Sequence, residues 1–301
     1  MKIFIVILSF LAMHGITIFA VPSKERSSDS SCDCVCGVRG REQKIVGGAE
    51  TQPNEYPWIA GLFKQNKLYC GAAIISQKYL LTAAHCVSNF EPREIRAFVG
   101  GHNISRDYTE KKRIKKIIYH DDFDIFSFDN DIALLELDSP ILYGPRVSSV
   151  CLPSGDETDF TNRLTVIAGW GRLGEKSQTS STLRSVIVPI WSSKECMAAG
   201  YGATRITENM MCGGYPEGEK DACQGDSGGP MVSEGPTGSM EVVGIVSWGR
   251  GCARKSLPGI YTKITNYLDW IHEHMEGECM CQRRIGEKTN YLEKLVSKNK
   301  I

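Results

Sequence analysis

One glycine-rich run, KDACQGDSGGP at residues 220–230, places the strongest local constraint on how this chain can fold. Gly225, Gly228 and Gly229 permit a tight backbone turn that residues with side chains rarely adopt. Such a turn exposes the hydroxyl group of Ser227 and aims neighbouring N–H groups at one point, where a developing negative charge on oxygen would be stabilised. The run therefore predicts a nucleophilic serine held in a rigid turn.

A serine hydroxyl is a weak nucleophile unless a base accepts its proton and a third group orients that base. The chain offers His85 in LTAAHC (residues 81–86) and Asp131 in DNDIALLEL (residues 129–137). The order His, Asp, Ser differs from the Ser, Asp, His order of many α/β-hydrolases and from the Asp, His, Ser order of subtilisin-type enzymes. The three residues are therefore candidates for one catalytic group.

Seven motifs in a fixed order resemble the chymotrypsin family of serine proteases, in its trypsin-like branch. The resemblance covers residues 45–275, and its motifs are IVGG (45–48), TAAHC (82–86), DNDIALL (129–135), AGWG (168–171), GDSGGP (225–230), SWG (247–249) and PGIYTKI (258–264). It implies that His85 is the general base, Asp131 its orienting acid and Ser227 the nucleophile. The N–H groups of Gly225 and Ser227 are then the expected oxyanion hole.

The pattern of short apolar runs predicts an all-β fold. Runs rich in β-branched and aromatic residues, such as 67–75, 164–168 and 241–248, alternate with turns rich in Gly, Pro and Asn. Residues 264–275 are the exception, because their apolar residues recur at helical spacing. The resemblance implies two antiparallel six-stranded β-barrels (trypsin-like) with the catalytic residues between them and a C-terminal helix.

Length and net charge do not indicate the function, which must be inferred from the candidate catalytic residues. The chain of 301 residues is 42% hydrophobic, enough for one or two packed units. Lys and Arg number 35, as do Asp and Glu, so no global field favours nucleic acid or an anionic membrane as a partner.

The first 20 residues predict a secretory signal peptide, because Lys2 precedes an apolar run and Ala20 supplies a small residue at the cut. A membrane anchor is the alternative, since the apolar character continues to Phe19. The interruption at residues 13–15 and the short length favour cleavage. We expect a secreted, extracellular protein with a cysteine-containing light segment at 21–44, a protease domain at 45–276 and a basic C-terminal tail at 277–301.

Twelve cysteines in a secreted chain indicate disulfides rather than zinc sites. The resemblance implies the pairs Cys70 with Cys86, Cys196 with Cys212, and Cys223 with Cys252. It also implies that Cys151 tethers the light segment, with Cys36 favoured over Cys32 and Cys34. Two bridges from the light segment to Cys279 and Cys281 would use the remaining cysteines. One bridge of the family is missing, and Thr165 and Ser233 occupy its two positions.

By resemblance, Asp221 lies at the floor of the primary substrate pocket, where a buried carboxylate selects a cation. Gly249 and Gly259 leave the pocket walls open, and Ser247 and Trp248 belong to the same SWG wall. Ala222 lacks a hydroxyl that would help to bind a lysine ammonium, whereas arginine can still form a bidentate pair, so we expect cleavage after Arg more readily than after Lys. Phe128 and Trp248 are expected to form an apolar shelf for residues upstream of the cleaved bond.

The resemblance also implies activation by a cut between Lys44 and Ile45, after which the new α-amino group pairs with Asp226 and orders the site. Leu68 replaces a histidine that holds this aspartate in some inactive relatives, so the strength of the inactive state is left open. Because Ala222 disfavours lysine, we expect another protease to make the cut. Protein inhibitors are further expected partners.

Other features have simpler interpretations. Asn103 begins the single N-glycosylation sequon, NIS, and an unused sequon is the alternative. No cofactor or metal is expected. The basic tail is interpreted as a solvated or disordered extension, and a heparin-like or membrane-surface contact is the alternative. Two alternative functions remain: a digestive trypsin, or a catalytically weak homologue that acts as a binding or cofactor protein.

Overall fold

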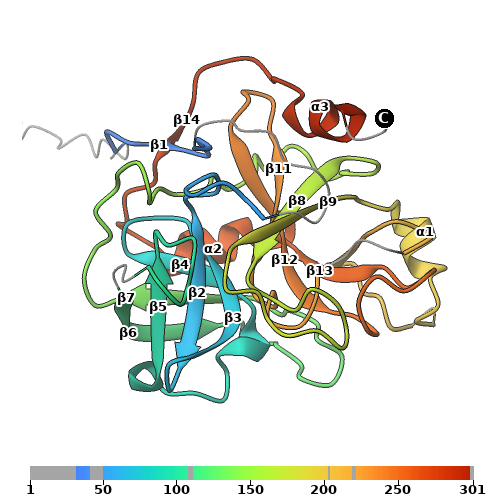
Figure 1. Cartoon of the computed structure of the whole chain (residues 1–301), viewed down its shortest axis with the longest axis horizontal. Coiled ribbons are helices and arrows are strands. Elements are labelled where there is room, and N and C mark those ends of the chain that lie inside the picture. The colour runs from blue at the N-terminus through green and yellow to red at the C-terminus, as the bar shows by residue number, and fades with distance from the viewer. Residues whose placement is uncertain (1–31, 41–49, 108–110, 203, 219–221, 299–301) are drawn as a thin grey trace, which may run out of the picture. The chain divides into compact units, whose positions relative to one another are not determined.

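The computed structural model describes residues 32–40, 50–107, 111–202, 204–218 and 222–298. The predicted signal peptide, Lys44, Ile45 and Asp221 therefore lie outside the described residues. The described chain is built mainly from strands in two six-stranded sheets (Figure 1), as expected for the trypsin fold. Among its helices none is long and apolar enough to cross a membrane.

The first sheet is a closed antiparallel barrel in the order β2-β3-β4-β7-β6-β5. Its strands are β2 (Ile59–Lys64), β3 (Lys67–Ile74), β4 (Tyr79–Thr82), β5 (Ile95–Val99), β6 (Lys111–Tyr119) and β7 (Ala133–Leu137). A short 3₁₀ turn, η2 (Pro92–Glu94), leads into β5. Trp58, Leu62 and Leu134 are fully buried inside this unit. Closure pairs every strand on both sides, which leaves the barrel without an open edge.

The second sheet has the order β10-β13-β12-β11-β8-β9. Its strands are β8 (Leu164–Gly169), β9 (Arg184–Pro189), β10 (Met210–Gly213), β11 (Pro230–Glu234), β12 (Met240–Trp248) and β13 (Gly259–Lys263). An isolated antiparallel bridge between Ile190 and Gly213 joins the ends of its two edge strands. The sheet is therefore barrel-like, as predicted.

The helices lie between and after the strands. The predicted helix at 264–275 is present as a 3₁₀ turn, η3 (Ile264–Tyr267), followed by α2 (Leu268–His274). A short helix, α1 (Ser193–Met197), precedes β10 and begins with a capping box between Ser192 and Glu195. Its Cys196 is bonded to Cys212 of β10.

The positions of the missing family bridge lie on two paired strands. Met231 and Val232 of β11 face Ile167 and Val166 of β8, so Ser233 and Thr165 are the next residues along. Both hydroxyl groups are buried and donate to carbonyl oxygens, Thr165 to Val188 at 2.8 Å and Ser233 to Leu164 at 3.3 Å. Hydrogen bonding thus satisfies these hydroxyl groups in place of a covalent link.

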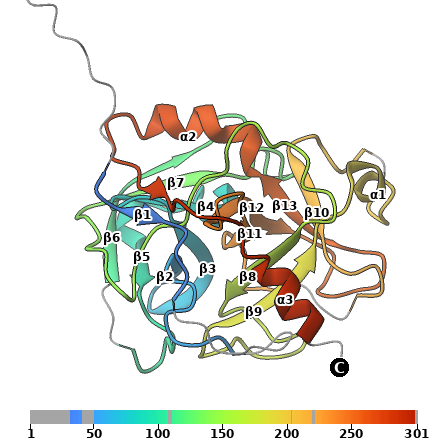
Figure 2. The ribbon, with the colours of Figure 1, turned by 90° about the horizontal axis from the view of Figure 1, so that it is seen from above.

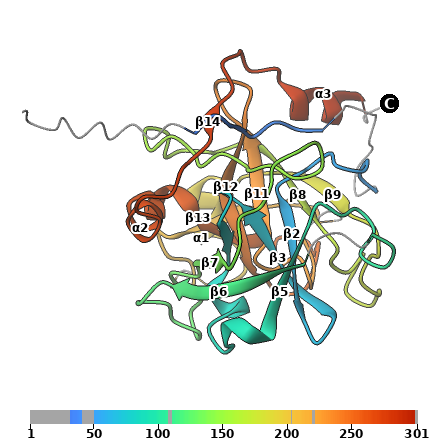
Figure 3. The same ribbon diagram turned by 90° about the vertical axis from the view of Figure 1, so that its left-hand side faces the viewer.

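The two ends of the described chain form a joint structure that we call the terminal clasp, consisting of residues 32–40 and 277–298. Within it β1 (Val35–Cys36) pairs in parallel with β14 (Gln282–Arg283). Disulfides join Cys32 to Cys279, Cys34 to Cys281 and Cys36 to Cys151. Figure 2 shows β1 beside β14, and in Figure 3 the chain runs from α2 through β14 to the last helix, α3 (Tyr291–Lys298).

The interpretation of the basic tail as a solvated or disordered extension is wrong. Leu292 and Leu295 of α3 are buried, and α3 packs against β8. The buried carboxylate of Glu234 accepts hydrogen bonds from the backbone N–H groups of Thr289 at 2.6 Å and Tyr291 at 2.7 Å. The expectation rested on the many charged residues of the tail. An amphipathic helix can carry such charges on its exposed side and still bury its apolar side.

Candidate active site

A braced turn positions His85. The residue lies in the 3₁₀ turn η1 (Ala84–Cys86), directly after β4, and the bridge from Cys86 to Cys70 ties this turn to β3. Thr82 adds a hydrogen bond of 2.8 Å from its hydroxyl to the carbonyl oxygen of Gly71. The imidazole is 17% exposed, so it is held in place and still reachable from solvent.

Asp131 lies beneath His85 and is completely buried. Its Oδ2 is 2.7 Å from Nδ1 of His85, and its Oδ1 accepts the backbone N–H of His85 at 2.9 Å. Ser247 donates its hydroxyl to the same Oδ2 at 2.5 Å. These three contacts offset the cost of burying a carboxylate. They favour a proton on Nδ1, which leaves the lone pair of Nε2 to act as a base. Nε2 lies 3.6 Å from the disulfide-bonded Sγ of Cys86, which has no proton to donate.

The glycine-rich turn holds Ser227 against both sheets. Gly225 has a φ of 99° and Gly228 a φ of 77°, which few other residues adopt. A Cβ atom on Gly228 would lie 2.3 Å from Oγ1 of Thr82, so glycine is also required by packing. The carbonyl oxygen of Ser227 accepts from Gly71 of the first barrel at 2.7 Å. The turn therefore joins the two halves of the fold where His85 is anchored.

One cavity of about 270 Å³ brings the predicted site residues together. It is lined by His85 and Ser227 and by six residues expected to contact substrate: Phe128, Ala222, Ser247, Trp248, Gly249 and Gly259. The ring of Phe128 lies edge-on to His85, with 5.5 Å between the ring centroids. No hydrogen bond joins Ser227 to His85 among the described residues, a common feature of sites without substrate.

Comparisons with known proteins agree with this geometry. The family model for trypsin matches residues 45–271. The chain is 36% identical to the clotting factor G beta subunit of Tachypleus tridentatus over 81% of its own length and 84% of that protein. The chain belongs to the trypsin family of serine proteases.

Two further relatives are much longer proteins. The chain is 39% identical to the serine protease filzig of Drosophila melanogaster over 78% of its length, and 36% identical to transmembrane protease serine 9 of Rattus norvegicus over 84%. It spans only 15% of the fly protein and 24% of the rat protein. Each of these two matches therefore covers only a part of the relative.

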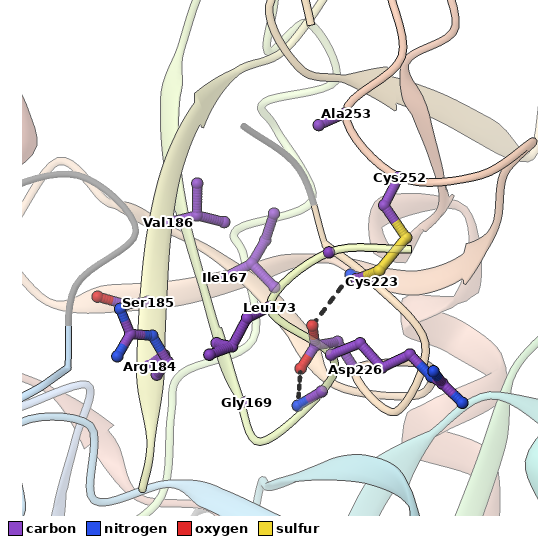
Figure 4. Close-up of a pocket in the computed structure, with 13 residues that line it drawn as sticks. Ile167, Gly169, Leu173, Arg184, Ser185, Val186, Cys223, Asp226, Cys252 and Ala253 are labelled. Carbon is purple, nitrogen blue, oxygen red and sulfur yellow. Dashed lines mark hydrogen bonds between the residues drawn. A yellow bond between two sulfur atoms is a disulfide. The ribbon is translucent and has the colours of Figure 1, made fainter. Parts of the chain in front are cut away.

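A second cavity has a volume of about 220 Å³, and Asp226 is one of the residues that line it (Figure 4). The Asp226 carboxylate accepts backbone N–H groups from Gly171 at 2.8 Å and Cys223 at 3.0 Å. Burial raises its pKa to about 6, and these two hydrogen bonds lower the pKa by less than burial raises it. A carboxylate with this environment would gain from a positively charged partner.

Two disulfides, one of which lines both cavities, have the pairing that was expected from the sequence. Cys223 is bonded to Cys252 between the cavities, and Cys36 to Cys151 as favoured from the sequence. One group with metal-ligand proximity occurs among the described residues, formed by Cys70, His85 and Cys86. Its two sulfur atoms are bonded to each other and are not thiolate ligands.

Sequence reasoning missed the supports of Asp131. Ser247 was expected to contact substrate, yet its hydroxyl also binds the Asp131 carboxylate, and Thr262 donates to the carbonyl oxygen of Asp131 at 2.8 Å. More than a hundred residues separate each of these donors from Asp131, so no local spacing could indicate them. At the predicted sequon, Oδ1 of Asn103 accepts the N–H of Ser105 at 2.9 Å, and glycosylation there stays a prediction.

Proposed function

We propose that this chain is the zymogen of a secreted trypsin-like serine endopeptidase that cleaves after arginine and, less well, after lysine. The observation that carries the proposal is the placement of His85. Its Nδ1 binds the buried Asp131 at 2.7 Å, while the ring lines the same cavity as Ser227. A base that is oriented from behind and lies in the same cavity as a serine is suited to activate this weak nucleophile.

In the proposed reaction, Oγ of Ser227 attacks the carbonyl carbon of the substrate while Nε2 of His85 accepts the hydroxyl proton. Asp131 stabilises the resulting imidazolium, which then donates the proton to the leaving amine. Water attacks the acyl-enzyme with the help of the same base and releases the acid. The N–H groups of Gly225 and Ser227 are proposed to bind the developing oxyanion.

The proposed preference for arginine rests on Asp221 as the acid of the pocket. Its neighbour Ala222 lines the cavity, as do Gly249 and Gly259. A Cβ atom on Gly249 would lie 3.9 Å from Cα of Gly259, so a larger side chain there would extend towards the opposite wall. Open walls beside an acid suit a long cationic side chain.

The proposed activation uses the Asp226 cavity. Glu50 forms an antiparallel bridge with Arg184, which lines that cavity. Ile45 precedes Glu50 by five residues, a distance of up to about 17 Å in an extended chain, and the freed N-terminus is proposed to enter this cavity. Pairing with an ammonium group would lower the raised pKa of Asp226 and favour its ionised form.

The light segment is proposed to stay attached after this cut. Three bridges join residues 32–40 to the rest of the chain. Gels of the cleaved protein test this, since the segment should separate only after reduction. Release without reductant would contradict it.

The function is tested with matched Arg, Lys and Phe peptides and the enzyme cleaved after Lys44. We expect Arg to be cleaved best, Lys less well and Phe hardly at all, with no turnover by Ser227→Ala. Comparable cleavage after Phe, or a preference for Lys, would reject the pocket assignment. Activation is tested with Lys44→Gln, which should remain inactive, and with Asp226→Asn, which should be nearly inactive even after correct cleavage.

Two alternatives make different predictions. A catalytically weak homologue would ordinarily lack a member of the catalytic group, whereas His85, Asp131 and Ser227 are all present. A digestive trypsin would use the same chemistry. The terminal clasp and the similarity to a protein named as a clotting factor subunit favour a selective enzyme with an upstream activating protease and protein inhibitors as partners.

A further inference from the structure

Two arginines flank an aromatic pair beside the cavity of the candidate active site. Trp248 lines that cavity, and its ring lies edge-on to the ring of Tyr201, with 5.0 Å between the centroids. The guanidinium of Arg205 lies 5.0 Å from the centroid of the Trp248 ring, and that of Arg250 lies 5.7 Å from the centroid of the Tyr201 ring. Both distances fall within the range of cation–π contacts.

These two arginines keep their charge available. Arg205 donates to the carbonyl oxygen of Phe126 at 2.7 Å, and Arg250 to that of Gly200 at 3.4 Å. Within the described residues, neither forms an ion pair with a carboxylate. By contrast Arg254, nearby in sequence, is held by both carboxylate oxygens of Glu175, at 2.6 and 3.0 Å. A guanidinium anchored by carbonyl oxygens and a ring face is positioned without being neutralised.

The acids near Arg205 are bound to other groups. Asp124 accepts the Ser127 hydroxyl at 2.7 Å and the Phe126 N–H at 2.9 Å. Asp129 accepts the hydroxyl of Thr207 at 2.7 Å. The hydrogen bond from Ser127 is the main reason that the pKa of Asp124 is lowered, and the charge of Arg205 contributes less. Asp124 therefore stays ionised near Arg205, but the described residues include no ion pair between them, and the Arg205 guanidinium can still bind a further carboxylate.

The backbone beside Trp248 offers a path for an extended peptide. β12 ends at Trp248, and the next two residues, Gly249 and Arg250, are exposed. Within the described structure no backbone hydrogen bond uses the N–H or carbonyl of Gly249, so both can pair with a peptide that lies alongside. An extended chain advances about 3.3 Å per residue, so its third and fourth residues before the cleaved bond would pass this aromatic pair.

We infer that Arg205 and Arg250 are specificity-determining residues that select substrates with an acidic side chain three or four positions upstream, counting the residue before the cleaved bond as the first. This inference rests on the proposed function, because it assigns a second substrate feature to the same cleft. A carboxylate there would meet two anchored cations, and a lysine would be repelled by them. The effect is electrostatic and exposed to solvent, so it should weaken as salt is added.

The test compares pairs of peptides that share the residue at the cleaved bond and differ only by Glu or Lys at the third or fourth position. We expect the ratio of kcat/KM for Glu over Lys to be about tenfold in the wild type at low salt, as for one or two exposed charge pairs. The double variant Arg205→Gln and Arg250→Gln should bring the ratio to about one, and each single variant should lie between.

Two controls separate charge from structure. Arg205→Lys should keep most of the ratio because it keeps the charge. Arg96→Gln should leave the ratio unchanged. Arg96 also donates to carbonyl oxygens, those of Arg93 and Ile95, but it lies in β5 of the first barrel and has no contact with the ring of Trp248 or Tyr201 among the described cation–π contacts. Active-site titration measures the concentration of functional enzyme in each preparation, so the rates are compared per folded, active molecule.

The outcomes distinguish this inference from the proposed function. A wild-type ratio near one would show that Arg205 and Arg250 do not select acidic substrates, and so would a double variant that keeps the full ratio. Neither result would contradict cleavage after a substrate arginine. Cleavage after a residue other than arginine or lysine overturns the proposed function. The ratio can then still be measured with peptides that carry the preferred residue.

Discussion

The candidate active site and the terminal clasp both bury carboxylates, but they surround them with different partners. Asp131 at the active site binds the backbone and ring of His85, a group that must gain and lose a proton in the proposed reaction. Glu234 at the clasp binds backbone N–H groups of Thr289 and Tyr291, which never change their charge. Burial of a carboxylate therefore does not by itself indicate a catalytic role; the group that it binds does.

The clasp has further fixed contacts of this kind. Glu241 is buried and accepts from Nε of Arg283 at 2.9 Å, and Glu55 accepts the hydroxyl of Tyr291 at 2.9 Å. The guanidinium of Arg39 lies 3.0 Å from the centroid of the Tyr291 ring. Together with three disulfides, these contacts join both ends of the described chain, residues 32–40 and 277–298, to the protease body. We therefore expect substitutions in the clasp to change stability and substitutions in the cleft to change catalysis.

The largest expected effect comes from Ser227→Ala, which removes the proposed nucleophile. Peptide cleavage should fall by at least about 10⁴-fold, while the melting temperature stays close to that of the wild type, because the alanine fits the same turn. Initial rates and thermal unfolding of the same sample measure both. Residual activity above one hundredth of the wild-type rate would contradict the assignment of Ser227.

The converse test is Leu292→Ala in α3. Leu292 is 1% exposed, so the shortened side chain should lower the free energy of unfolding by about 2–4 kcal/mol through lost burial and a cavity. Chemical denaturation measures this change, and kcat/KM for an Arg peptide should stay within about twofold of the wild type. Glu293→Ala, on the solvent side of the same turn, is the matched control and should change stability by less than about 0.5 kcal/mol. A large loss of activity in Leu292→Ala would show that the clasp and the cleft are coupled.

The two regions also differ in how far the sequence predicted them. The catalytic candidates lie in compact motifs. In the structure, His85 binds Asp131 and lines the same cavity as Ser227. The clasp depends on Glu55, Glu234 and Glu241, which carry no motif and are far from their partners in sequence. Tyr291, Leu292 and Leu295 did offer a signal, since they lie on one side of a helix. The prediction for the tail rested on its charges alone and therefore missed this apolar side.

The third test concerns Asp226, whose carboxylate has no cationic partner among the described residues and is proposed to gain one on activation. Its pKa of about 6 lies above its usual 3.8, so the folded chain holds a proton that the unfolded chain releases between these values. The free energy of unfolding should therefore fall as the pH rises from about 4 to 6, by roughly 2–3 kcal/mol for this group.

The measurement uses the uncleavable Lys44→Gln protein with and without Asp226→Asn, unfolded by denaturant at pH 4, 5 and 7. The added substitution should flatten the decrease in stability across this range. Asp107→Asn is the control, because backbone hydrogen bonds, chiefly from Asn103, lower the pKa of Asp107, and its contribution is lost only as the pH falls below the usual value. An unchanged pH profile in Asp226→Asn would mean that another group is responsible.

The smallest expected effect lies inside the cleft, at Ala222, where the change alters preference and not catalysis. This half-buried alanine, which follows Asp221 in the sequence, lines the cavity, and its side chain offers no acceptor to a lysine ammonium. Ala222→Ser adds one hydroxyl, and a hydrogen bond of about 0.5–1.5 kcal/mol should raise kcat/KM for Lys relative to Arg by about three- to tenfold. Arginine gains less, because its planar guanidinium can already form two hydrogen bonds with a carboxylate. Ala222→Gly, which adds no acceptor, should leave the ratio near that of the wild type. If serine at this position leaves the Lys to Arg ratio unchanged, Ala222 does not contact the end of the substrate side chain, and the preference for arginine has another origin.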